Sequence, residues 1–281
     1  MLSKLFLLSL FCIISCGDIV DEAPASLNIP KKVSRWDLER IKSESLDIRM
    51  SEEFYEFFAK KDEDKNGFNP IEQMAHTWNM AHPELDFYSL PFIRTEEKAY
   101  AELKEYRDDE MGIYLSRDWF EGHSSASLGI TQFWAKRFNE GKANEYLMLV
   151  HADIIINFRD HDYSITKEED KYDLYTVILH EMGHMIGLPH PRRLGEEDAV
   201  MAPRLGKGEI KRKLLPNDFK ALFKTYPISD SKYFFDIPDQ TAPFNLFREP
   251  EEERFIIEFL KDGHKHYHHN GKYISCEKNI H

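Results

Sequence analysis

The apolar side chains of this 281-residue chain recur at helical spacing in three stretches. Spacings of three and four residues place side chains on one face of a helix. They predict one helix that starts at Asn69-Pro70 and continues to Ala81, one over Tyr172–Gly187, and one around Phe219–Tyr226. Residues 33–61 are rich in charge and contain scattered aromatic residues, so we expect short helices there.

Other segments have the character of strands. Met111–Ser116 and Leu147–Phe158 are runs of β-branched and apolar residues and are predicted as strands. The pattern of Gly129–Phe138 fits a strand or a helix. His264–Cys276 is predicted to form a hairpin, because its Asn270-Gly271 dipeptide favours a two-residue turn.

A further short helix is expected around Phe255–Leu260. Pro250 stands before this apolar segment and Gly263 stands after it. Proline is favoured at the first position of a helix and glycine just past its end, so the two residues frame a helical segment.

The N-terminus has the pattern of a signal peptide. Lys4 precedes a run from Leu5 to Ile14 that is apolar except for Ser9 and too short to span a bilayer. The end of this segment resembles the lipobox of bacterial lipoproteins, with Cys16 as the residue that would be lipidated. We therefore expect anchoring to a membrane of a bacterial envelope through Cys16, with a plain secretory signal as the alternative. Asp after the cysteine resembles an inner-membrane retention signal, and Gly17 stands there instead, which favours the outer membrane.

Composition and charge exclude several classes of protein. The chain has 37 basic and 50 acidic side chains, a formal charge of −13, and 42% hydrophobic residues. This is the composition of a globular protein. The acidic balance argues against a nucleic-acid partner, which requires a basic surface. Three cysteines cannot form a disulfide-rich scaffold.

The segment HEMGHMIGLPH at residues 180–190 carries the strongest chemical signal. His180 and His184 lie four positions apart, so both imidazoles project from one helix face. Gly187 allows the helix to end and the chain to turn, so that His190 can return as a third ligand. Three neutral nitrogens with one open position suit one catalytic Zn²⁺. Glu181 lies beside them as the candidate general base.

This segment resembles the signature of the metzincin metalloproteases, and among them the matrixins. Met201, within DAVMAP, fits the family's Met-turn beneath the zinc. The resemblance implies an α+β catalytic domain with a twisted mixed sheet, long helices, a zinc-binding helix and a C-terminal helix. The expected organisation is a signal peptide (1–15), a tether and helical flank (16–65), a catalytic domain (66–227) and a C-terminal extension (228–281).

The resemblance implies a zinc-dependent endopeptidase that acts on a protein or peptide substrate. Two alternatives stay open. One is a non-catalytic surface module that keeps the fold for binding, and the other is a narrow peptidase that processes one envelope partner. The sequence predicts neither the substrate nor the oligomeric state.

The chain departs from the family pattern between Phe158 and His180, which are only 22 positions apart. The edge that aligns substrate must therefore be short, around Ser164–Thr166, or come from another segment. His161 and Asp162 fall near the expected first ligands of the family's structural zinc, but the remaining ligands are missing.

Two weaker motifs remain. Asp62-x-Asp64-x-Asn66-Gly67 resembles the opening of a calcium-binding EF-hand loop, but Gln73 replaces its final glutamate. We expect a polar turn there, with Ca²⁺ as the alternative. In the C-terminal hairpin, His264, His266 and His268 alternate and therefore share one strand face. That face is expected to be solvated, with metal binding as the alternative.

Overall fold

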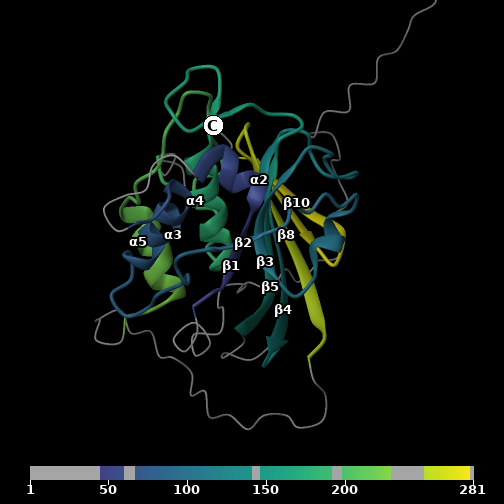
Figure 1. The fold of residues 1–281 in the computed structure, drawn as a ribbon. Coiled ribbons are helices and arrows are strands. Elements are labelled where there is room, and N and C mark those ends of the chain that lie inside the picture. Colours follow the sequence, from purple (N-terminus) through teal and green to yellow (C-terminus); the bar gives the residue numbers. More distant parts are fainter. Residues whose placement is uncertain (1–44, 60–66, 141–145, 192–197, 229–249, 279–281) are drawn as a thin grey trace, which may run out of the picture. The chain divides into compact units, whose positions relative to one another are not determined.

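The computed structural model describes residues 45–59, 67–140, 146–191, 198–228 and 250–278. Their main element is a mixed sheet of eight strands in the order β10-β9-β8-β4-β5-β3-β1-β2 (Figure 1). The strands are β1 (Ile48–Ser51), β2 (Ile93–Thr95), β3 (Met111–Ser116), β4 (Ser127–Phe138), β5 (Tyr146–Asn157), β8 (Glu252–Leu260), β9 (His264–His269) and β10 (Lys272–Lys278). Pairing is parallel among β2, β1, β3 and β5, and antiparallel from β5 through β4, β8, β9 and β10.

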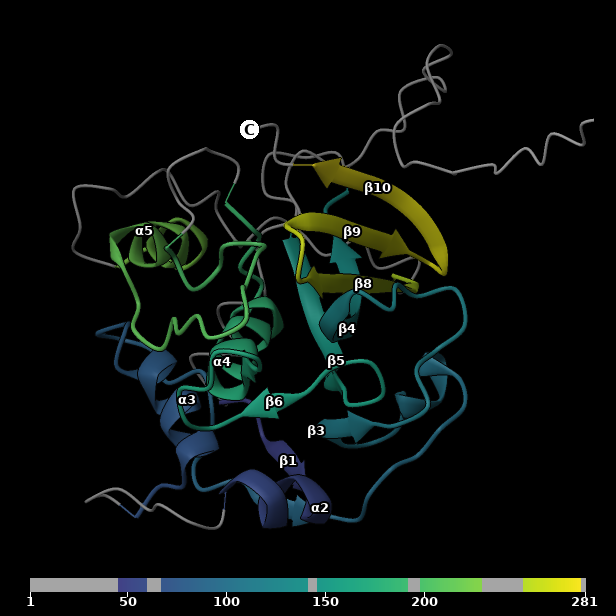
Figure 2. The same cartoon turned by 90° about the horizontal axis from the view of Figure 1, so that it is seen from above.

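Three longer helices lie on one face of this sheet (Figures 1 and 2). They are α3 (Pro70–Asn79), α4 (Leu174–Met185) and α5 (Pro216–Thr225). The shorter helices are α2 (Glu52–Phe54), the π-helix η1 (Tyr55–Ala59) and the 3-10 helix η2 (Leu103–Tyr106). Strands β6 (Tyr163–Ser164) and β7 (Tyr172–Asp173) form a small second sheet just before α4.

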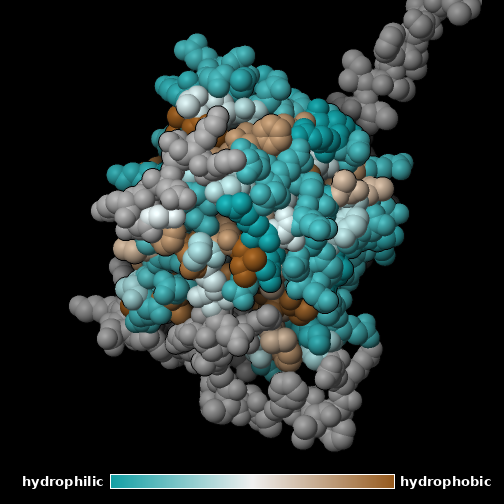
Figure 3. Space-filling view, in the orientation of Figure 1, coloured by the Kyte–Doolittle hydropathy of each residue, from teal (hydrophilic) through white to brown (hydrophobic). Residues whose placement is uncertain are grey.

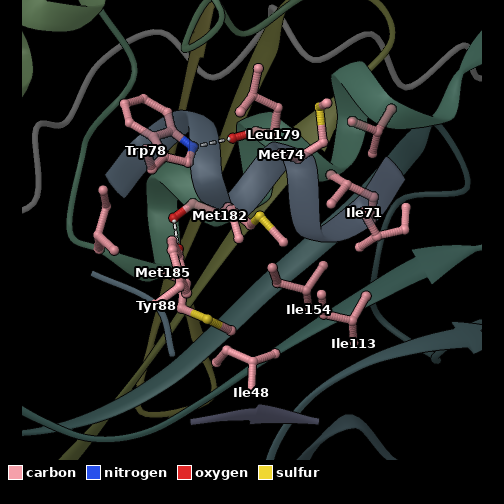
Figure 4. Close-up of a cluster of buried hydrophobic side chains, with 14 of the residues drawn as sticks. Ile48, Ile71, Met74, Trp78, Tyr88, Ile113, Ile154, Leu179, Met182 and Met185 are labelled. Carbon is pink, nitrogen blue, oxygen red and sulfur yellow. Dashed lines mark hydrogen bonds between the residues drawn. The ribbon is translucent and has the colours of Figure 1, made fainter. Parts of the chain in front are cut away.

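The sheet separates two apolar cores. The larger core packs α3 and α4 against side chains such as Ile113 and Ile154, which point to the helical face (Figure 4). The smaller core lies on the opposite face and includes Tyr114, Ile155 and Ile256, covered by η2 and by the segment after β3. Because both faces of the central strands are buried, those strands are apolar at consecutive positions rather than alternating with polar residues.

The predicted helix at Asn69-Pro70 is confirmed, and its start shows why it forms. The Asn69 side chain accepts hydrogen bonds from the backbone N–H groups of Ile71 and Glu72, both at 3.0 Å. Glu72 reciprocates by accepting from the Asn69 N–H at 2.9 Å. This capping box, with Pro70 at the first helical position, satisfies the N–H groups that a helix leaves unpaired at its start.

The strand predictions at residues 111–116 and 147–158 are confirmed, and residues 129–138 lie in strand β4. The expectation of short helices in residues 33–61 holds only in part for the described residues. Helices α2 and η1 lie there, but β1 precedes them as a strand of the main sheet. Its four residues pair with two neighbouring strands, which a local pattern does not reveal.

The helix predicted at Phe255–Leu260 is wrong, because these residues form most of strand β8. Phe255, Ile257 and Phe259 contribute to the larger core, whereas Ile256 belongs to the smaller one. Apolar residues on both sides of a buried strand make a continuous run that periodicity alone cannot distinguish from a helix. Pairing with β4 along the whole of β8 determines the strand state.

The C-terminal hairpin is confirmed. Strands β9 and β10 pair antiparallel, and Asn270 and Gly271 have φ values of +49° and +75°, as a type I′ turn requires. Together with β8, the hairpin extends the same sheet that contains β3, β4 and β5 (Figure 2). Strands β8, β9 and β10, which lie beyond residue 227, thus share a sheet with the predicted catalytic domain.

Apolar residues on the face of the molecule shown in Figure 3 are scattered. Figure 3 shows one face, on which hydrophilic residues predominate and apolar residues form small separate groups. Among the described residues, no helix is both long and apolar enough to cross a membrane.

Candidate metal centre

Helix α4 is held in place by hydrogen bonds from aromatic side chains of other segments. Trp78 Nε1 donates to the carbonyl of Leu179 at 2.9 Å (Figure 4). The Tyr88 hydroxyl donates to the carbonyl of Met182 at 2.6 Å, as the same figure shows. These bonds fix the helix at the two turns that carry the candidate ligands, so the position of those ligands is set by the core.

The helix ends where the sequence predicted, and the ending returns His190 to the helix. Gly187 has φ +84°, its N–H donates to the carbonyl of His184 at 2.8 Å, and the Leu188 N–H donates to the carbonyl of Gly183 at 2.9 Å. This is a Schellman motif, which reverses the chain direction and requires a residue with positive φ. His190 follows the turn and faces the helix.

The three histidines converge on one point. His190 Nε2 lies 3.1 Å from His180 Nε2 and 3.0 Å from His184 Nε2. The other ring nitrogen, Nδ1, of each histidine has an oxygen partner. For His180 it is the Val200 carbonyl and for His184 the Leu188 carbonyl, both at 2.7 Å. For His190 it is the Tyr267 hydroxyl at 3.1 Å. A carbonyl only accepts, so Nδ1 of His180 and of His184 carries the proton, and their Nε2 lone pairs face inward.

This arrangement fits a metal ion. Ligands at about 2.0–2.1 Å from a tetrahedral zinc lie about 3.3–3.4 Å apart, close to the separations found here. Burial lowers the pKa of His180 well below its ordinary value and that of His184 to about 4. Both imidazoles are therefore neutral at pH 7, and a cluster of buried neutral nitrogens with their Nδ1 atoms held by oxygens is the usual environment of metal-binding histidines.

Glu181 points toward strand β4. Its Oε2 accepts a hydrogen bond from the Thr131 hydroxyl at 2.5 Å, and its Oε1 is buried with no hydrogen-bond partner among the described residues. A Cβ on Gly129 would stand 2.8 Å from Oε1, so a glycine at this position leaves room for the carboxylate. Burial raises the pKa of Glu181 to about 8, and the Thr131 hydrogen bond acts in the opposite direction. Neither Gly129 nor Thr131 was predicted as part of the site, because the contact of β4 with helix α4 is not a local feature.

Met201, the predicted Met-turn residue, lies against helix α4 at Gly183. It is buried, and a Cβ on Gly183 would collide with its Sδ at 2.2 Å, so the thioether packs directly against the helix between the two ligands. Asp218, at the start of α5, holds this turn. Its carboxylate accepts from the N–H groups of Val200, Met201 and Leu215 at 3.1, 3.0 and 2.8 Å.

Two aromatic residues of the C-terminal strands cover the centre. The Phe259 ring of β8 stacks on His180 with centroids 3.7 Å apart, and Tyr267 of β9 contacts His190. The three histidines are at most 2% exposed and Glu181 is fully buried. The hairpin was predicted from the sequence, but no local signal indicated that its Tyr267 contacts His190.

The remaining residues predicted from the sequence lie away from this centre or outside the described residues. Cys16 and the residues Asp62, Asp64 and Asn66 of the calcium-like loop lie outside the described residues. Ser164 lies in the small second sheet, where β6 pairs with β7.

His161, considered for a structural zinc, lies against Tyr163 and Tyr172 with its Nε2 buried and unbonded. In the parts of the chain that the structure describes, it joins no group of three metal-ligating side chains.

A mixed sheet covered by helices, with a His-Glu-x-x-His helix above a buried methionine turn, defines a metallopeptidase of the metzincin type. Comparison with protein-family models matches residues 19–227 to the matrixins. The chain belongs to the matrixin family of zinc-dependent peptidases. Comparison with curated proteins finds no match.

Proposed function

We propose that the protein is a zinc-dependent endopeptidase in which Glu181 is the general base. The observation that carries this proposal is the convergence of His180, His184 and His190 Nε2 atoms at 3.0–3.1 Å beside a buried carboxylate. All four residues are intact, which favours an enzyme over a module that keeps the fold only for binding.

The metal ion and the side chains of the protein would have separate roles in peptide hydrolysis. His180, His184 and His190 would hold a zinc ion, which would supply the Lewis acidity that makes a water molecule more acidic and polarises a peptide carbonyl. A cation held by the three histidines would favour the ionised form of Glu181, whose pKa burial alone raises. Ionised Glu181 would take the proton of the attacking water and pass it to the leaving amine. The Thr131 hydroxyl holds Oε2 of Glu181, which leaves the unpartnered Oε1 as the atom that receives the proton.

The burial of the centre favours a narrow processing peptidase over an enzyme of broad degradation. Phe259 and Tyr267 cover the histidines, and β8 occupies the β4 edge of the sheet along its whole length. An extended polypeptide cannot reach histidines that are at most 2% exposed, so a substrate must be able to displace part of this cover. Few sequences would combine that ability with a scissile bond in the correct place.

The decisive experiment compares the wild type with Glu181→Ala in zinc analysis and in a peptide-library digest, with Glu121→Ala on an exposed loop as the matched control. We expect all three proteins to bind zinc at the centre, and only Glu181→Ala to lose cleavage, by several orders of magnitude. Near-normal turnover in Glu181→Ala would remove the general-base assignment. Zinc binding by the wild type without any cleavage would favour the non-catalytic module.

We also propose that lipidated Cys16 anchors the mature chain to the bacterial envelope, in the outer membrane. The support is the signal-like segment before Cys16 and the absence of Asp after it. Two or three acyl chains would hold the protein firmly, because one chain alone gives marginal binding. Labelled fatty acid should enter the wild type and not Cys16→Ala, and only the wild type should sediment with outer-membrane fractions. An unlabelled, secreted wild type would support the plain secretory signal instead.

A further inference from the structure

A second group of metal-ligating side chains lies on the opposite side of the C-terminal strands from the catalytic histidines. Glu258 of β8 has its Oε1 3.0 Å from His123 Nδ1 and 2.7 Å from His268 Nε2 of β9. His123 belongs to the segment between β3 and β4. It precedes Glu258 by 135 positions in the sequence. The ligand atoms of the three residues all lie within 4.8 Å of one another.

The second oxygen of Glu258 is held by the segment that precedes β4. Oε2 accepts from the Ser127 hydroxyl at 2.5 Å and from the Ser124 N–H at 3.1 Å. The Trp119 indole donates to the Ser124 carbonyl at 2.9 Å, which fixes this segment further. The carboxylate is therefore oriented by neutral donors at Oε2, and Oε1 is directed at the two histidines.

The buried charge of Glu258 favours a cationic partner. Its carboxylate is fully buried, and a buried charge is costly unless it is paired. Within the described part of the chain, every ion pair of Glu258 is with a histidine: His123, His268 and, at 4.0 Å, His266. A divalent cation between these three side chains would pair the buried carboxylate directly.

The donor set also indicates the kind of ion. Two imidazole nitrogens and one carboxylate oxygen suit zinc or another late first-row divalent metal rather than calcium or magnesium, which prefer oxygen. The ligand separations of 3.0 and 2.7 Å need to widen by about 0.3 and 0.6 Å to reach the about 3.3 Å of a tetrahedral zinc site, and all three ligand atoms lie within 4.8 Å of one another. We propose that His123, Glu258 and His268 bind a second divalent metal ion, Zn²⁺ by preference, which fastens β8 and β9 to the segment before β4.

The position of this site connects it to the catalytic centre. Successive side chains of a strand point to opposite faces. Glu258 is followed by Phe259, which stacks on His180, and His268 is preceded by Tyr267, which contacts His190. A metal that fastens one face of the two strands thereby fixes the two aromatic residues over the catalytic centre on the other face.

Metal stoichiometry tests the proposal. The purified full chain, stripped with a chelator and reloaded with Zn²⁺, should bind two equivalents. Glu258→Gln and His268→Gln should each bind one, as should His184→Gln, which loses only the catalytic ion. His264→Gln, on the same strand face but outside the cluster, is the matched control and should keep two.

One equivalent in the wild type, unchanged in Glu258→Gln, would overturn the second site, and so would loss of an equivalent in His264→Gln. His184→Gln lacks a ligand of the catalytic site, so a zinc equivalent that it still binds must occupy the second site. The two proposals can therefore fail independently.

A second measurement does not depend on the folding of the cluster variants. Co²⁺ added to His184→Gln should give the visible absorption of a four- or five-coordinate site with nitrogen and oxygen ligands, at one equivalent. Zn²⁺ should also raise the Tm of His184→Gln and leave that of the His184→Gln/His268→Gln double variant unchanged. A Co²⁺ spectrum of the hexa-aqua ion alone in His184→Gln would overturn the proposal.

Discussion

The ring of Phe259 stacks on the imidazole of His180 with centroids 3.7 Å apart and planes inclined by 10°. The same imidazole donates to the Val200 carbonyl through Nδ1. His180 is thus fixed on its face by a C-terminal strand and at its edge by the methionine turn. Segments from two distant parts of the chain together orient one ligand.

Replacing Phe259 by Ala should loosen this ligand. Loss of a buried phenyl ring should lower the free energy of unfolding by about 3–5 kcal/mol. Removing a group that orients a ligand should also weaken zinc affinity by about 10- to 100-fold. Chelator competition measures the affinity and urea denaturation the stability. Phe255→Ala is the matched control, because Phe255 stacks on Phe133 instead and should lose stability with unchanged affinity. Equal zinc affinities in the two variants would contradict the role of Phe259.

Thr131→Val should impair turnover while leaving zinc in place. The valine keeps the volume of the buried side chain but removes the hydroxyl that donates to Glu181 Oε2. A carboxylate displaced by about 1 Å costs roughly 100-fold in rate, so we expect kcat to fall by about that factor. Thr131→Ser, which keeps the hydroxyl, should restore most of the activity. Unchanged kcat in the valine variant would show that Glu181 needs no such support.

Asp218→Asn should destabilise the protein and weaken the zinc site. The carboxylate is fully buried and accepts three backbone N–H groups, two of them from Val200 and Met201. An amide offers one oxygen and turns an NH₂ group toward these donors, so we expect a loss of about 3 kcal/mol in the free energy of unfolding. Asp118→Asn, on an exposed loop, should change it little. Equal urea midpoints for the two variants would argue against this role of Asp218.

The ion pair of Arg137 and Glu253 should make stability depend on pH. Arg137 donates to both oxygens of Glu253, at 2.7 and 3.0 Å, and joins β4 to β8. Burial opposes ionisation of Glu253, but the hydrogen bonds and charges of Arg137 and His269 outweigh it and lower the pKa of Glu253 below its ordinary 4.5.

A lowered folded-state pKa stabilises the protein above the ordinary value, and this contribution is lost as the pH falls through the folded value. The difference in urea midpoint between the wild type and Glu253→Gln should therefore be constant near neutral pH and shrink below about pH 4.5. Glu121→Gln, on an exposed loop, should follow the wild type throughout. A difference that persists to pH 2 would show that the carboxylate contributes through packing rather than charge.

Much of the candidate site could be predicted because its determinants are local. His180, Glu181 and His184 lie on one helix, and Gly187 ends that helix with a positive φ that brings His190 back. The capped start at Asn69-Pro70 and the Asn270-Gly271 turn also depend on neighbouring residues only. Such elements appear in the sequence as spacings and dipeptides with a fixed physical meaning.

Only the tertiary structure decided what surrounds these elements. The segment 255–260 has no periodicity that distinguishes a helix from a buried strand. It forms part of strand β8 because it pairs with strand β4. The contact of Phe259 with His180 and the meeting of His123 with Glu258 join residues 79 and 135 positions apart. The sequence by itself therefore determined helix α4 and the candidate ligands that it brings together, since helix geometry acts over a few residues. The cover over that helix and the second histidine cluster depend on long-range strand pairing, whose partners no local pattern identifies.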